Sequence, residues 1–196
     1  MQQGMDPLLK DWIQVISWGV AIIGGLVAAF VALYQLSASN KQRRRELRWQ
    51  QANAGRQLLD EMFDDSKSKD ALRMLDFPGR DEFKDIPASD KKVGFSDIRK
   101  ALEVTTTNDG DYLTFTYKDD KSVFIRDRFD GLFYYLERFE YFRENELLEF
   151  RDIRTPIEYY AKIIAKHNGL FLHYSKTVGY DGAAKLLEEL QKTSLS

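Results

Sequence analysis

The sequence contains no cysteine, four prolines and two histidines in 196 residues. Without cysteine the chain forms neither disulfides nor thiolate metal sites, and this fits a reducing compartment. A glycine-rich phosphate loop, a GxSxG nucleophile motif and an HExxH zinc motif are also missing. His167 and His173 stand six residues apart, so a shared zinc ion would need additional carboxylate ligands. We therefore expect no enzyme activity, no metal and no cofactor.

Charge is absent from one long stretch, which runs from Trp12 to Asn40. Its apolar core, Trp12 to Leu36, would span roughly 37 Å as a helix, more than the ~30 Å hydrocarbon core of a bilayer. This pattern predicts a transmembrane helix over 12–36, because a buried core helix rarely extends so far without a charge. A secretory signal peptide remains the alternative, since Ser37-Ala38-Ser39 is similar to a cleavage site, although such peptides have shorter apolar runs and basic starts.

A basic run follows the apolar segment and predicts its orientation. Residues 41–48 carry a net charge of +4, whereas residues 1–11 carry −1. The positive-inside rule then places the short tail, 1–11, outside and the C-terminal part in the cytoplasm of a single-pass protein of the cell inner membrane. We also expect the cations of this run to contact anionic lipid headgroups: Lys41, Arg43, Arg44, Arg45 and Arg48.

Small side chains recur at helical spacing within the apolar segment. In lipid, such residues let two helix backbones approach closely, so the pattern predicts a homo-oligomer assembled through this helix. The alternative is that glycine and alanine are simply common in membrane helices. The positions expected to associate are Ser17, Ala21, Gly24, Gly25, Ala28 and Ala29.

The remaining chain is mostly helical in pattern. We expect a basic juxtamembrane stalk helix over 37–65, continuous with the transmembrane helix, and then an α-rich cytosolic domain over 66–196. Residues 49–196 carry a net charge of −5, which argues against binding duplex nucleic acid. The fold class is thus mostly α, with a small β-hairpin. Helices are predicted over 69–76, 97–104, 127–144, 155–168 and from 181, a helical or extended segment over 170–177, and strands over 112–117 and 122–125.

Five cationic or titratable side chains form a candidate binding site for a small anionic ligand. Charge-assisted hydrogen bonds from such groups hold phosphates. The alternative is that they are solvated and paired with the many nearby Asp and Glu residues. The candidates are Arg126, Arg128, Lys162, Lys166 and His167.

The string from Arg126 to Ile164, RDRFDGLFYYLERFEYFRENELLEFRDIRTPIEYYAKII, resembles a loose group of bacterial single-pass membrane proteins of unknown function. Glu137, Glu146 and Tyr160 are the matching positions. More broadly, a small anchor with a compact cytosolic domain looks like membrane effectors of prokaryotic antiphage systems, including those gated by cyclic oligoadenylate in type III CRISPR defence. That resemblance implies ligand-driven assembly of the membrane helices and loss of membrane integrity.

Two functions follow as expectations. The first is a non-enzymatic, oligomerising membrane effector, whose cytosolic domain senses a small anionic ligand, a cyclic nucleotide in the resemblance, or a partner protein. The second is a passive membrane anchor or scaffold subunit for a partner complex. The ligand, the trigger, the oligomer number and the formation of a pore are not encoded in any motif of the sequence.

Overall fold

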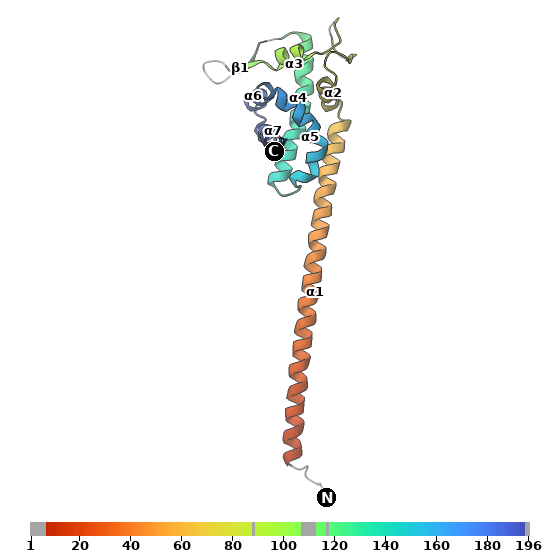
Figure 1. Cartoon of the computed structure of the whole chain (residues 1–196), viewed down its shortest axis with the longest axis vertical. Coiled ribbons are helices and arrows are strands. Elements are labelled where there is room, and N and C mark those ends of the chain that lie inside the picture. The colour runs from red at the N-terminus through yellow and green to blue at the C-terminus, as the bar shows by residue number, and fades with distance from the viewer. Residues whose placement is uncertain (1–6, 88, 107–112, 117, 195–196) are drawn as a thin grey trace. The chain divides into compact units, whose positions relative to one another are not determined.

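The computed structural model describes residues 7–87, 89–106, 113–116 and 118–194 (Figure 1). Several side chains within these ranges, including those of residues 13–17, 19–23 and 27, are outside the description. The prediction of a mostly helical chain is confirmed, because seven helices and one pair of short strands account for the named elements of the described part. Two compact units, residues 1–49 and 50–196, are described separately below.

The first unit consists, in its described part, of residues from α1, which extends over Pro7–Asp64. Large apolar side chains near its middle are exposed, among them Leu26 at 67%, Phe30 at 72% and Leu33 at 66%. Among the described residues, no helix combines the length and the apolar character that crossing a bilayer requires. The segment predicted to do so, 12–36, contains many of the positions whose side chains are outside the description.

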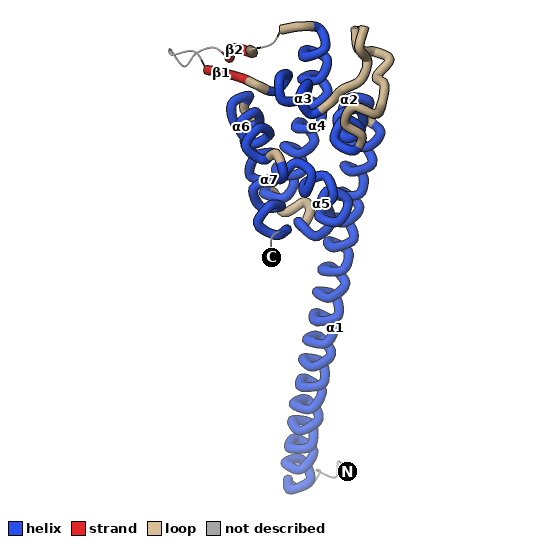
Figure 2. Tube along the Cα trace, turned by 45° about the horizontal axis from the view of Figure 1, so that its top comes forward, coloured by secondary structure: helices blue, strands red, loops and turns tan. Residues whose placement is uncertain are grey.

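The second unit is built around one long helix, α4, over Asp120–Glu144. α2 (Ser66–Asp76), α3 (Phe95–Leu102) and α7 (Asp181–Ser194) pack against α4. α5 (Phe150–Lys166) and α6 (Asn168–Val178) pack in turn against α7, as Figure 2 shows. The central helix therefore carries most of the packing surface of this unit.

The apolar face predicted for this helix is confirmed. Its five members recur at helical spacing and are at most 2% exposed: Phe129, Leu132, Phe133, Leu136 and Phe139. Each buried side chain of this size contributes about 1.5–3 kcal/mol relative to exposure. Phe129 packs on Phe171 of α6 with ring centroids 5.5 Å apart, and Phe133 packs on Tyr174 at 5.7 Å.

The predicted hairpin is wrong in its second strand. Residues 122–125 form the first turns of α4, because the Asp119 side chain accepts a hydrogen bond from the Ser122 backbone N–H at 2.9 Å and so caps the helix. The first predicted strand is confirmed in part as β2, Leu113–Phe115. Its partner is β1, Val104–Thr106, which precedes it and pairs with it in antiparallel register.

Other boundaries differ from the predictions by a few residues. α3 begins two residues earlier, at Phe95, and ends before β1. α5 begins at Phe150 rather than near Thr155, because Asp152 accepts a hydrogen bond from the Glu149 backbone N–H at 3.1 Å and supplies the cap. The segment predicted as helical or extended over 170–177 is helical, within α6.

Candidate functional site

The two predicted arginines of α4 are engaged in contacts within the domain. Arg126 is 7% exposed, and its Nη1 donates to the Ala101 carbonyl at 3.0 Å. The guanidinium of Arg126 lies 4.3 Å from the ring centroid of Phe115. The hydrogen bond and the cation–π contact of Arg126 connect α4 to α3 and to the strand pair, so this guanidinium already has partners inside the domain.

Arg128 has carboxylate partners on two helices. Its Nε lies 3.3 Å from Asp70 of α2, and its Nη1 lies 2.6 Å from Asp127 of α4. The exposed fraction of the Arg128 side chain is 15%. This arginine therefore joins α2 to α4.

Lys162, Lys166 and His167 lie at the C-terminal end of α5 and its junction with α6, but they face different surroundings. Lys162 Nζ pairs with Glu158 at 3.1 Å, one turn earlier on α5. Lys166 and His167 line a hollow of about 860 Å³. Among the described residues that line it, Arg126, Arg128 and Lys162 are absent. The structure thus divides the five predicted residues among four places and brings only Lys166 and His167 together.

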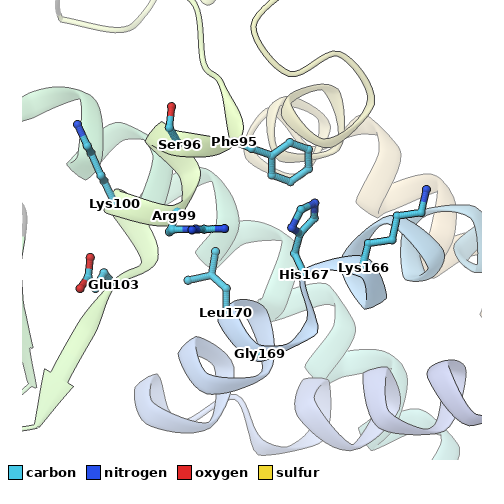
Figure 3. Close-up of a pocket in the computed structure, with 9 residues that line it drawn as sticks. All are labelled: Phe95, Ser96, Arg99, Lys100, Glu103, Lys166, His167, Gly169 and Leu170. Atoms are coloured by element: carbon cyan, nitrogen blue, oxygen red, sulfur yellow. The ribbon is translucent and has the colours of Figure 1, made fainter.

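Two groups of side chains form the walls of this hollow, which we call the α3–α6 hollow (Figure 3). α3 contributes Phe95, Ser96, Arg99 and Lys100. These positions are spaced i, i+1, i+4 and i+5, so they lie on one face of the helix. The α5–α6 junction contributes Lys166, His167, Gly169 and Leu170. In Figure 3 the Arg99 side chain points toward His167, above Leu170.

The hollow is electropositive. Arg99 and Lys166 are exposed, and in the described part of the chain neither has a carboxylate within ion-pair distance. Glu103 is the one acidic residue among the described side chains that line the hollow. In addition, α6 begins at Asn168 without a side-chain cap, and its second residue, Gly169, lies in the lining. Backbone N–H groups at a helix N-terminus favour negative charge, and of those at the start of α6 the Leu170 N–H already donates to the His167 carbonyl at 3.0 Å.

An aromatic pair forms one side of the hollow. The ring of Phe95 on α3 and the imidazole of His167 lie with centroids 4.2 Å apart and an interplanar angle of 33°. Both residues are half-buried. The pair joins α3 to the start of α6, so it holds the two walls of the hollow together.

Sequence reasoning missed Arg99, Lys100 and Phe95. Phe95 and Arg99 are one helical turn apart, which was a usable signal for one shared face. Nothing local, however, indicates that this face meets Lys166 and His167, which lie about 70 residues further along the chain.

The three positions on which the resemblance depends have structural roles here. Glu137 accepts a hydrogen bond from the Ala183 backbone N–H at 2.9 Å and caps α7. Glu146 has a left-handed backbone with φ of 57°, and its carbonyl accepts from Gln51 at 2.8 Å. Tyr160 donates to Asp76 at 3.0 Å, and burial together with this bond raises the pKa of Tyr160 to about 12.

The remaining predicted sites are on α1. A Cβ added to Gly24 or Gly25 would meet nothing within 4 Å, and Ala28 and Ala29 are exposed. The side chains of Ser17 and Ala21 are outside the description. The five cations of the basic run, Lys41 to Arg48, are exposed.

The histidines have separate environments. His173 Nε2 lies 3.3 Å from the Val104 carbonyl, while His167 packs on Phe95. Within the described residues, no group of three or more metal-ligating side chains is assembled.

Comparison with known proteins returned no match to a family model, to a curated protein or to a solved structure.

Proposed function

We propose that this chain is a membrane-anchored, oligomerising, non-enzymatic effector whose second unit binds a small anionic ligand in the α3–α6 hollow. The observation that supports ligand binding is that Arg99 points toward His167 across one hollow, whose described lining also includes Lys166 and a single acid, Glu103 (Figure 3). A phosphate-bearing ligand suits these donors, because charge-assisted hydrogen bonds to phosphate oxygens are short and strong.

The anchor is proposed from the N-terminal segment. It has no charged residue between Trp12 and Asn40, and a basic run follows directly. Exposed apolar side chains in its described part, Leu26, Phe30 and Leu33, suit a lipid environment. Fractionation tests this: the full chain should stay in the membrane pellet after alkaline carbonate washing, and release into the wash would refute the anchor.

Ligand occupancy would act on the membrane through α1. This helix extends over Pro7–Asp64, so it includes residues of both units. We propose that binding changes the packing of the N-terminal helices in the oligomer and perturbs the membrane during antiphage defence. A cyclic oligonucleotide is the ligand that the resemblance implies.

The binding experiment compares Arg99, which lines the hollow, with Lys162, which lies outside it. The full chain in nonionic detergent is titrated with ethyl phosphate, followed by ³¹P line broadening. Arg99→Gln should weaken binding by about tenfold or more, because a hydrogen bond to a charged group contributes about 1.5–3 kcal/mol. Lys162→Gln, outside the hollow, should change affinity less than twofold. Equal effects of both variants, or no saturable binding by the wild type, would refute the proposal.

A scaffold function is the second candidate, and exposed tyrosines on α4 favour it. Tyr134 is 53% exposed and Tyr141 62%, and Arg138 lies between them on the same helix face. Tyr and Arg are enriched at protein interfaces. Replacing Gly25 and Ala29 by Leu separates the two functions in a liposome leakage or cell-viability assay, because an effector should lose activity whereas a passive scaffold should retain partner binding unchanged.

A further inference from the structure

We infer that the ligand of the α3–α6 hollow carries a planar aromatic ring beside its phosphoryl group, so that the site selects aryl phosphate esters over alkyl phosphates and free phosphate. This inference rests on the proposed function, because it names the class of ligand for the same hollow.

The size of the hollow supports a ligand larger than an ion. Its volume is about 860 Å³, within the range of roughly 300–1,000 Å³ that is typical of small-molecule pockets. A phosphate group occupies only a few times the ~30 Å³ share of one water molecule. Phosphate alone would leave most of this hollow to solvent and most of its apolar wall uncovered.

The chemistry of the lining divides into two parts. Arg99 provides positive charge for the phosphoryl group, whereas the Lys166 side chain points away from Arg99 in Figure 3. Phe95, His167 and Leu170 provide an apolar and aromatic surface beside Arg99. Figure 3 shows the Phe95 and His167 rings next to each other, with Arg99 pointing toward them.

The aromatic pair suits a further ring. The centroids of Phe95 and His167 are 4.2 Å apart at an interplanar angle of 33°, and both half-buried rings line the hollow. A ligand ring that joins such a pair gains an aromatic contact of the kind that holds the two side chains together. A guanidinium near the same surface adds a cation–π contribution.

The test varies the ligand before it varies the protein. Phenyl, cyclohexyl and ethyl phosphate are titrated against the full chain in nonionic detergent, with phenol as the ligand that lacks an anionic group. Phenyl phosphate should bind about two- to tenfold more tightly than cyclohexyl phosphate, because the two esters are similar in size and differ in the planar π system. Phenol should bind more weakly than any ester.

Phe95→Leu is the matched variant, because it retains apolar bulk without the ring. It should abolish the preference for phenyl over cyclohexyl phosphate, while Phe95→Tyr should keep the preference. The thermal midpoint of each variant is measured alongside, and the comparison of ligands on the wild type holds even if Phe95→Leu fails to fold.

The outcomes separate the two proposals. If no ester binds saturably, the proposed anion site itself fails. If all three esters bind equally, the anion site stands and the aromatic inference is overturned. If phenyl and cyclohexyl phosphate bind alike and both exceed ethyl phosphate, the hollow selects apolar area, and the requirement for a ring is overturned.

Discussion

Glu140 provides the sharpest test of how the second unit is held together. It lies on α4 and is 1% exposed. Its two carboxylate oxygens accept hydrogen bonds from Arg143 Nε and Nη2, both at 2.7 Å, and one of them lies 2.9 Å from Lys185 Nζ of α7. The prediction concerns Glu140→Gln, which keeps the shape of the side chain and removes its charge.

The expected loss of stability follows from the partners. Removing one member of a buried ion pair typically costs about 3–5 kcal/mol, because the other charge stays buried. In Glu140→Gln, Arg143 still has Glu189 as a carboxylate partner at 2.7 Å. The side chains of Arg143 and Lys185 are 23% and 55% exposed, so both charges still reach water or another carboxylate. The glutamine still accepts one hydrogen bond. We therefore expect Glu140→Gln to lower the free energy of unfolding by about 1–3 kcal/mol.

The same substitution should alter the pH dependence of stability. Burial alone would raise the pKa of Glu140, but hydrogen bonds from Arg143 and Lys185 together outweigh it and hold that pKa below its ordinary value of 4.5. A carboxyl group with a depressed folded pKa contributes stability above the unfolded pKa and loses it as the pH falls through the folded pKa. The wild type should therefore lose stability below about pH 4.5 more steeply than Glu140→Gln.

Guanidinium unfolding followed by near-UV circular dichroism of tyrosine measures both effects. Of the ten tyrosines only Tyr34 precedes residue 50, whereas all three tryptophans do, so the tyrosine signal reports on the second unit. Glu144→Gln is the control, since Glu144 also contacts Lys185 but its side chain is 54% exposed. It should change stability by less than about 0.5 kcal/mol. Equal losses of unfolding free energy in the two variants would refute the reasoning. So would a loss of stability at acid pH that is as steep in Glu140→Gln as in the wild type.

Three further substitutions test the packing and the strained positions. Gly131→Ala should destabilise by about 1 kcal/mol despite better helix propensity, because an added Cβ would lie 2.6 Å from Lys67 Cβ and overpack α2 against α4; an increase in the thermal midpoint would contradict this. Glu146→Gly should stabilise by about 0.5–1 kcal/mol, since φ of 57° suits glycine, and urea unfolding measures the gain. Burial raises the pKa of Asp130, which accepts from Tyr174 at 2.7 Å. A raised folded pKa means that stability falls as pH rises through it, so Asp130→Asn should flatten that decline and be more stable at pH 7 than the wild type; an unchanged pH profile of unfolding would count against it.

Much of the helical fold was predictable because its signals are local. The apolar face of α4 recurs at helical spacing, and Asp181 at the start of α7 follows a glycine that ends α6 at a left-handed φ of 97°. The hairpin prediction failed where two local signals competed. Lys118 to Lys121 suited a turn between strands, but Asp119 suited a helix cap equally well, and burial of Phe124 and Ile125 on α4 favoured the helix.

The candidate site was predictable only in part. Lys166 and His167 are predicted from the sequence as ligand-binding side chains near a helix end, and the structure places both at the α3–α6 hollow. Arg126 and Arg128 looked equally available in the sequence. Their engagement by Ala101, Asp70 and Asp127 depends on helices that are distant in sequence, and no local pattern reports such partners.

The sequence by itself determined the helical content, the buried face of the central helix, and the position of a charge-free apolar segment before a basic run. These properties depend on side chains within a few turns of one another, where periodicity and caps act directly. The tertiary structure decided which strand pairs with Leu113–Phe115, that Glu137 caps α7, and that Phe95 and Arg99 share a hollow with Lys166 and His167. Those contacts join segments up to about 70 residues apart, and their geometry follows from how α3, α6 and α7 pack around α4 rather than from any single stretch of chain.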